Sequence, residues 1–216
     1  MSPDLKLHGY WRSSAAYRVR IALHAKGLAF EQQVHNLRTG EQRDPAYLAL
    51  APQGLVPALE AEGHVLTQSL AIIEWLEERH PAPPLLPADA EGRAVVRAMA
   101  GLVACDIHPI GNLRVLRALR QDFNADQAAV DAWARHWIAE GFAALEVLIA
   151  RRGAGFAYGD SLTMADCCLV PQLYNAERFK VDLGPYPRLR DAAERTRALP
   201  AVQAAHPDQQ PGAVFE

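Results

Sequence analysis

Two short polar segments stand where a helix is expected to begin, and both suit the binding of an anion. Ser13 and Ser14 precede one helical run, and Gln68 with Ser69 precedes another. Serine hydroxyls and the unpaired N–H groups of a first helical turn donate toward the same point, so they can bind a thiolate or a carboxylate. A thiol with an ordinary pKa of about 8.5 ionises near neutral pH in such surroundings. Serine is equally a preferred helix cap, and for each serine taken alone that structural role is favoured.

Four cationic or titratable side chains could recognise a carboxylate: Arg12, His108, Arg114 and Arg178. A guanidinium matches a carboxylate with two parallel hydrogen bonds. A single helical arginine is more often a solvated surface residue, and a histidine in an apolar helix is more often a buried, hydrogen-bonded one. Individually, these residues therefore indicate no more than a possible anion site.

Val56 and Pro57 stand at the start of a predicted short strand. Proline lacks a donor for the strand ladder, so it belongs at a strand start or an edge. Only about 5% of bonds before proline are cis, and the sequence by itself does not establish a cis bond here.

The elements that must position these residues alternate in type over the first third of the chain. Period-two alternation predicts strands at 5–10 and 30–35, and short strands at 56–60 and 64–67 with Glu62-Gly63 as their turn. Helices are predicted from the serine cap at 13–14 to Gly27, at 46–50, and from a cap at Ser69 to Arg79. The order βαβαββα predicts a parallel strand pair within an α/β domain.

A proline-rich segment, 80–87, separates this part from a second that is predicted to be all helical. Proline excludes a helix interior and a central strand there, so the segment is the expected linker between domains 4–82 and 88–212. Helical spacing predicts helices at 91–120, 127–150, 163–179 and 186–199, and irregular chain at 206–212. Thr163 and Asp166 have the spacing of a capping box, a structural feature and not a catalytic one.

Composition narrows the class of protein. The formal net charge is −3, with 22 basic and 25 acidic residues interspersed, so no basic surface for nucleic acid is expected. Cys105, Cys167 and Cys168 are too few and too irregularly spaced for a disulfide framework or a structural zinc site, and we expect packing roles for them and no metal. The N-terminus lacks a signal-peptide pattern, and no apolar stretch reaches the roughly 20 residues of a membrane span. A soluble cytoplasmic protein without membrane contact is expected.

The order of these features resembles the cytosolic glutathione transferases, with a thioredoxin-like first domain and an all-helical second domain. Five segments carry the resemblance to the zeta class of that family: 13–23, 53–59, 68–74, 106–109 and 175–183. They extend over nearly the whole chain. The zeta class comprises the maleylacetoacetate and maleylpyruvate isomerases. The resemblance therefore implies an enzyme that uses glutathione as its cofactor and forms a homodimer.

The resemblance also implies residues for the glutathione site. Ser13, with Ser14 beside it, would face the sulfur, and Val56, before a cis Pro57, would pair its backbone with the cysteinyl part. Further expected contacts are Gln68 and Ser69 at the γ-glutamyl end, Gln42 at the glycyl end, and His108 and Asn112 from the second domain.

For the substrate, a dicarboxylate, the resemblance implies Arg12, Arg178 and Arg114 as carboxylate ligands. One position departs from the family pattern: Ala15 stands where many members have cysteine. A thiol is therefore absent from the turn, and the hydroxyl of Ser13 is expected to provide the activation.

The implied reaction converts maleylacetoacetate to fumarylacetoacetate in tyrosine and phenylalanine catabolism, by thiolate addition, bond rotation and elimination. Three alternatives stay open from the sequence. They are a maleylpyruvate isomerase of gentisate degradation, a transferase that conjugates glutathione to electrophiles, and a non-catalytic binding protein of the same fold.

Overall fold

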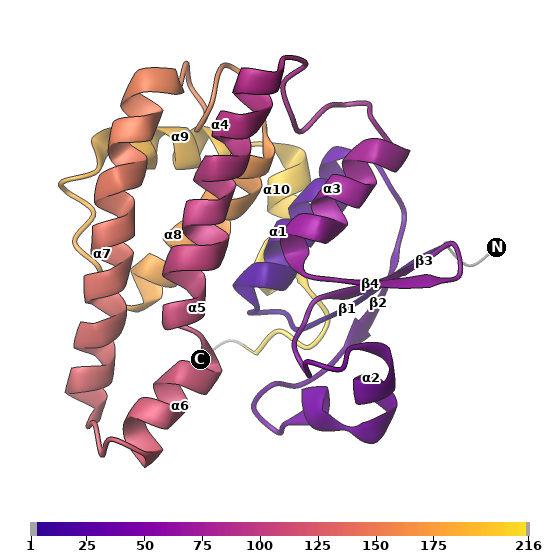
Figure 1. The fold of residues 1–216 in the computed structure, drawn as a ribbon, viewed down its shortest axis with the longest axis vertical. Coiled ribbons are helices and arrows are strands. Elements are labelled where there is room, and N and C mark those ends of the chain that lie inside the picture. Colours follow the sequence, from indigo (N-terminus) through magenta and orange to yellow (C-terminus); the bar gives the residue numbers. More distant parts are fainter. Residues whose placement is uncertain (1–3, 215–216) are drawn as a thin grey trace. The chain divides into compact units, whose positions relative to one another are not determined.

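The computed structural model describes residues 4–214. The chain forms two compact units: the first runs to Leu85 and also takes in the chain from Arg197 onward, and the second is Leu86–Thr196. The first contains a sheet with helices, and the second is helical (Figure 1). This is the predicted fold class, and the prediction is confirmed.

A four-stranded sheet organises the first unit. Its strands are β1 (Leu5–Gly9), β2 (Glu31–Val34), β3 (Ala58–Ala61) and β4 (His64–Thr67), in the order β2-β1-β3-β4. As predicted, β1 and β2 are parallel, whereas β1–β3 and β3–β4 are antiparallel. The β3–β4 turn has positive φ at both Glu62 (50°) and Gly63 (79°), the geometry that matches the twist of a two-residue hairpin.

Three helices flank the sheet: α1 (Ser14–Ala25) and α3 (Ser69–Arg79) lie on one side, and α2 (Pro45–Leu50) lies on the other (Figure 1). Helical spacing places Ile72, Ile73 and Leu76 of α3 on one fully buried stripe. Each such side chain contributes about 1.5–3 kcal/mol of burial free energy as an upper estimate. A short 3-10 helix, Glu41–Arg43, precedes α2.

The proline-rich segment after α3 is tied to the first unit by one buried lysine. Lys26 Nζ donates to Glu77 Oε2 (2.7 Å), to the carbonyl of His80 (2.6 Å) and to that of Pro83 (3.0 Å). All three ammonium hydrogens thus have acceptors, which is what a buried charge requires. The segment contains no helix, as predicted, and these hydrogen bonds hold it in place.

Chain beyond residue 199 is more regular than the sequence analysis expected. Helix α10 (Pro200–Ala204) and a 3-10 turn (Pro207–Gln209) follow α9, and α10 packs against α1. Pro200 stands at the first helical position, where its missing N–H costs nothing. The turn at 207–209 corrects the expectation of irregular chain over 206–212.

In the second unit, the predicted continuous helix over 91–120 is interrupted. Helix α4 (Ala90–Gly101) continues as a π-helical segment (Leu102–Ile107) and a short α5 (His108–Ile110), and α6 (Leu113–Gln121) starts afresh after Gly111. Asn112 caps α6 by accepting from the N–H of Arg114 (3.2 Å). Periodicity did not reveal the break because the apolar positions keep nearly the same spacing through it.

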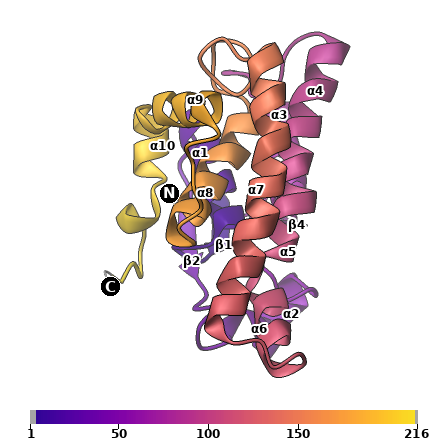
Figure 2. The same cartoon turned by 90° about the vertical axis from the view of Figure 1, so that its left-hand side faces the viewer.

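The remaining helices are α7 (Gln127–Arg152), the long helix in Figure 2, α8 (Met164–Arg178) and α9 (Pro187–Arg197). Helix α4 packs against α8, and α7 packs against the π-helical segment. Gly141 permits the close approach of α7, because a Cβ there would lie 2.2 Å from Ile107 Cδ1. Cys167 and Cys168 are buried as expected, but Cys105 is exposed, so a packing role for it is wrong.

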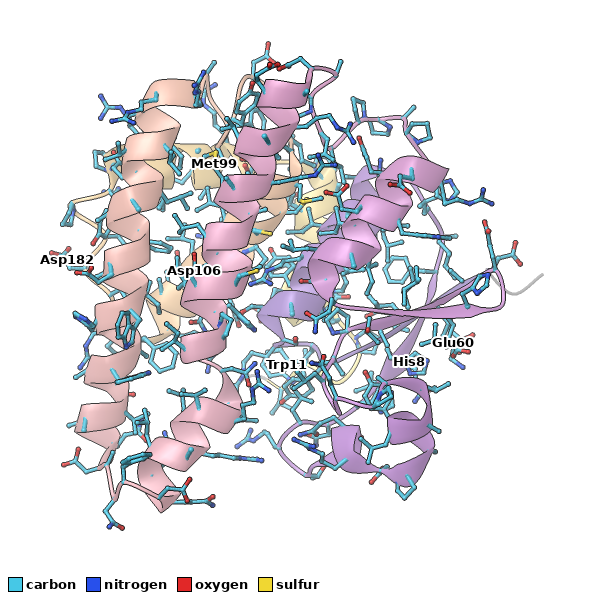
Figure 3. All side chains as sticks on the ribbon, viewed as in Figure 1. His8, Trp11, Glu60, Met99, Asp106 and Asp182 are labelled. Carbon is cyan, nitrogen blue, oxygen red and sulfur yellow. The ribbon has the colours of Figure 1, made fainter. Side chains whose placement is uncertain are left out.

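The helical run from Ala90 to Gln121, 32 residues long, meets the length and composition of a membrane-spanning helix, with a mean hydropathy of 1.3 over 18 residues. This finding differs from the expectation that no apolar stretch of the chain reaches the length of a membrane span. A core helix of a soluble protein meets the same criteria. Met99 and Asp106 mark the run in Figure 3.

Candidate active site

The turn between β1 and α1 presents Ser13 at the start of the helix. Ser13 is the N-cap, with extended backbone (φ −69°, ψ 117°), and its Oγ accepts from the N–H of Ala16 (3.2 Å). The Ser13 N–H donates to the carbonyl of Tyr10 (3.0 Å). The hydroxyl proton remains available to a ligand, and the first-turn N–H groups of α1 point the same way. Ser14 is buried in that first turn.

The N-terminus of α3 carries the second polar pair. Gln68, not Ser69, is its N-cap, so the prediction of a Ser69 cap is wrong. Gln68 has φ 69°, a region that non-glycine residues seldom adopt and that recurs at ligand sites. Its Nε2 donates to Gln53 Oε1 (2.7 Å), and Ser69 Oγ accepts from Arg18 Nη1 (3.2 Å). Ser69 keeps its own hydroxyl proton for another acceptor.

The backbone N–H and C=O groups of Val56 are available to a ligand. The Val56–Pro57 bond is cis, as the resemblance implies. Within residues 4–214, no hydrogen bond engages the N–H or C=O of Val56. The hydroxyl of Tyr47 donates to the carbonyl of Leu55 (2.7 Å), which fixes the preceding residue. Val56 can therefore pair with an extended peptide as an added strand would.

Gln42 lies in the short 3-10 helix before α2. Its side chain is buried, and its Oε1 has no hydrogen-bond partner in the described part of the chain. A Cβ at Gly54 would lie 2.9 Å from the Gln42 carbonyl oxygen, so the backbone of Gln42 packs against the turn before Val56. A buried amide oxygen without a partner is available to a donor on a ligand.

The remaining predicted residues divide between the units. Arg12, in the first, lies with Cζ 5.2 Å from the ring of Trp11, in cation–π range. In the second unit, His108 directly follows the π-helical segment, a feature common at functional sites. Arg114 is an exposed residue of α6, and Arg178 ends α8. Asn112 already serves as the α6 cap, which is a structural reason for an asparagine there.

A histidine network around the buried His8 in the first unit was not predicted from the sequence. His8 Nε2 lies 2.7 Å from Glu60 Oε1, and His8 Nδ1 lies 2.9 Å from His35 Nε2 (Figure 3 labels His8 and Glu60). The His35 ring contacts that of Tyr47, with centroids 4.1 Å apart. The bond to His8 lowers the pKa of Glu60, and burial lowers that of His35. Alternation placed His8 on a strand, but only the cross-strand register brings these groups together.

Among residues 4–214, no group of three or more His, Cys, Asp or Glu side chains could hold a metal ion. The polar groups gathered in the first unit are instead hydroxyls, amides and free backbone groups. Such groups bind a flexible, peptide-like anion by many directed hydrogen bonds.

Comparison with known proteins agrees with this chemistry. Residues 12–79 match the family model for the glutathione S-transferase N-terminal domain, and residues 127–198 match that for the C-terminal domain. The maleylacetoacetate isomerase of Pseudomonas aeruginosa is 51% identical over 96% of this chain and 98% of its own.

Two solved structures are also similar. A holo maleylpyruvate isomerase, described as a bacterial zeta-class glutathione S-transferase, superposes with a TM-score of 0.95 at 49% identity, over 97% of this chain and 100% of its own. A maleylacetoacetate isomerase from Anaeromyxobacter dehalogenans, with dicarboxyethyl glutathione and citrate bound, has a TM-score of 0.88 at 49% identity, over 99% of each chain. The chain therefore belongs to the glutathione S-transferase family, in its zeta class.

Proposed function

We propose that this chain is a glutathione-dependent cis–trans isomerase that converts maleylacetoacetate to fumarylacetoacetate. The observation that carries the proposal is the turn at Ser13, where the side chain that caps α1 keeps its hydroxyl proton for a ligand at the N-terminus of the helix. Family membership, with relatives of that activity at about half identity over the whole chain, supports the choice of reaction.

Glutathione fits the polar groups of the first unit. Val56 has both backbone groups free for the cysteinyl part, and the α3 N-terminus with Ser69 suits the γ-glutamyl carboxylate. The unpaired amide oxygen of Gln42 suits a donor near the glycyl end. When bound, glutathione supplies a thiolate that can add to a conjugated double bond and leave again, which allows the bond to rotate.

The chain's own residues prepare and orient these groups. Ser13 donates its hydroxyl proton to the thiolate, and the first-turn N–H groups of α1 add to the stabilisation. Arg12, Arg178 and Arg114 are the proposed ligands of the two substrate carboxylates, and His108 and Asn112 are further proposed contacts of glutathione. No thiol is needed at Ala15, because the hydroxyl at Ser13 already has its proton free.

Maleylpyruvate is the second candidate substrate. The TM-score of 0.95 to a maleylpyruvate isomerase favours it, whereas sequence identity does not separate the two, at 50% to a maleylpyruvate isomerase and 51% to a maleylacetoacetate isomerase. The two substrates differ only in the chain beyond the ketone. We place maleylacetoacetate first because isomerases named for that substrate recur among the similar bacterial proteins, at 51% and 46% identity.

The chain is further proposed to be a cytoplasmic homodimer. Family membership supports the dimer, and three cysteines without a disulfide between them accord with a reducing compartment. Light scattering on the purified protein tests the dimer: a mass of one chain across the micromolar range would exclude it.

Chromatographic product analysis tests the function. The protein is incubated with each substrate, with and without glutathione. Conversion to the fumaryl product that depends on glutathione and returns it intact supports an isomerase, and the faster substrate identifies which. A stable glutathione adduct with a general electrophile, without isomerisation, would indicate a conjugating transferase. Glutathione binding without any turnover would indicate a binding protein.

A further inference from the structure

Arg20 lies in the middle of α1, yet its side chain reaches the turn that precedes the helix. Helical side chains point toward the N-terminus, which directs the guanidinium along α1 to that turn. Nη2 donates to the carbonyl of Trp11 (3.0 Å), and Nη1 lies 3.5 Å from that of Tyr10. Nε donates to the carbonyl of Ala205 (3.1 Å). Figure 3 labels Trp11, whose carbonyl receives the shortest of these bonds.

One carbonyl joins Arg20 to the catalytic turn. The Tyr10 oxygen accepts from the N–H of Ser13 (3.0 Å) on one side and faces Arg20 Nη1 on the other. The guanidinium therefore fixes the backbone that presents the Ser13 hydroxyl. A planar group with donors in a rigid fork is suited to hold two successive carbonyls at once.

Arg20 also carries a buried charge that no acid neutralises. Its exposed fraction is 1%, and within residues 4–214 no carboxylate forms an ion pair with it. Its partners are three neutral carbonyls and the ring of Tyr17, 5.3 Å from Cζ. Burial lowers the pKa of Arg20 to about 10, so it is still protonated at neutral pH.

Other charged groups lie on or against α1, and each has contacts of its own. Arg12 lies over the ring of Trp11, and Arg18 donates a hydrogen bond to Ser69. Lys26 forms an ion pair with Glu77. The ring of His24 contacts that of Phe30, and the ring of His206 contacts that of Tyr17. Lys26 has an acidic partner among these bonds, whereas the hydrogen bonds of Arg20 within residues 4–214 all go to neutral carbonyls. In a medium of low polarity such a charge acts over several ångströms.

We propose that Arg20 is a positioning residue for the thiolate of glutathione, which holds the turn at Tyr10–Ser13 and supplies a fixed positive charge beneath the helix N-terminus. The proposal rests on the use of glutathione stated under Proposed function. A purely structural alternative is that Arg20 only fastens the segment at Ala205 to α1. That alternative predicts a loss of stability without a change in the ionisation of bound glutathione.

The test is a titration of the glutathione thiol in the binary complex, followed by the ultraviolet absorption of the thiolate, without substrate. Arg20→Met removes the charge and the donors, Arg20→Lys keeps the charge, and Arg190→Met removes an exposed arginine as the matched control. We expect Arg20→Met to raise the thiol pKa by about one unit, a tenfold loss of thiolate below that pKa. Arg20→Lys should stay within a few tenths of a unit, and the control should not change.

A folded Arg20→Met that binds glutathione with an unchanged thiol pKa overturns the proposal. Circular dichroism and glutathione affinity establish that the variant is folded. Arg20→Gln is a second neutral variant, whose amide can still donate to one carbonyl. Should both neutral variants fail to fold, Arg20→Lys decides: a thiol pKa near that of the wild type supports the role of charge, and a rise of a full unit contradicts it.

The same titration separates this inference from the proposed function. A wild-type complex whose thiol pKa equals that of free glutathione would remove the thiolate site, and both proposals with it. A wild-type complex with a lowered thiol pKa but no isomerisation would remove only the isomerase, and the effect of Arg20 could still be measured.

Discussion

The N-termini of α1 and α8 each have a buried charged side chain close by, but backbone groups of opposite kind stabilise the two charges. Each begins with a hydroxyl residue, Ser13 or Thr163, and each has a buried charged residue nearby, Arg20 or Asp166. At α1 the charge is a cation held by backbone carbonyls. At α8 it is an anion held by backbone N–H groups. Burial shifts the pKa of both toward the neutral form, to about 10 for Arg20 and about 6 for Asp166.

The difference lies in what the bonds leave free. Asp166 accepts from the N–H groups of Ala157 (2.7 Å) and Thr163 (2.9 Å) and from the Thr163 hydroxyl (2.8 Å), which completes a capping box. The Thr196 hydroxyl is 3.4 Å away, but it donates to the Ala192 carbonyl at 2.8 Å. The α8 end is thus closed upon itself, whereas the Ser13 hydroxyl keeps its proton free. The comparison indicates a folding element at α8, and it supports the proposal that the N-terminus of α1 is a binding element.

The largest effect is expected from Asp166→Ala. Two buried N–H groups would lose their acceptor, at about 1–3 kcal/mol each, so we expect a loss of about 4 kcal/mol in the free energy of unfolding. Chemical denaturation measures it, with the exposed Asp191→Ala as control. If the thiol pKa of bound glutathione also moved in the folded variant, the separation between the two helix ends would be broken.

The second prediction concerns pH. Burial, the dominant cause, raises the pKa of Asp166 to about 6, above its ordinary value near 4, so the folded state binds the additional proton between these values. Stability contributed by this group therefore increases as pH falls from about 6 to about 4, by up to roughly 3 kcal/mol. The difference in unfolding free energy between the wild type and Asp166→Ala should be larger at pH 4.5 than at pH 8. Each of these pH values lies about one unit or more from the folded pKa. A difference that shrinks at low pH would show that the bonds from Ala157 and Thr163 outweigh burial.

Replacing each of the two helix caps by alanine should separate an effect on turnover from an effect on stability. Ser13→Ala removes the proposed proton donor to the thiolate, and we expect turnover to fall about 100-fold with a stability loss of only about 1 kcal/mol. Thr163→Ala should cost about 1–2 kcal/mol of stability and leave turnover unchanged. Steady-state kinetics and denaturation of both variants measure this. Full turnover in Ser13→Ala would exclude Ser13 from the mechanism.

The smallest effect is expected at the other end of α8, where Arg178 is proposed to bind a substrate carboxylate. Arg178→Met should raise KM about tenfold with little change in kcat, because ground and transition states share that contact. Arg190→Met, an exposed arginine of α9, serves as the control for the lost charge. A lower kcat at unchanged KM would contradict a binding role and show that Arg178 acts on the transition state.

Much of the fold followed from local sequence signals. Strand alternation, the serine before α1 and Gly27 after it, and the Thr163–Asp166 box each act within a few residues, so they are readable without tertiary contacts. The family signature added the cis bond at Val56–Pro57, which spacing alone did not establish. The helix break at Gly111 and the Gln68 cap lay outside these signals, because neighbouring packing decides them.

The sequence by itself thus determined the two-part architecture, the turn that carries Ser13 and the family of the chain. Only the tertiary structure decided the use of the buried charges. Arg20 meets a carbonyl 185 residues away, and His8 meets Glu60 across 52 residues. In the sequence these are ordinary residues of a helix and a strand. Their roles depend on which distant groups are buried beside them, and periodicity, caps and composition contain no information about that.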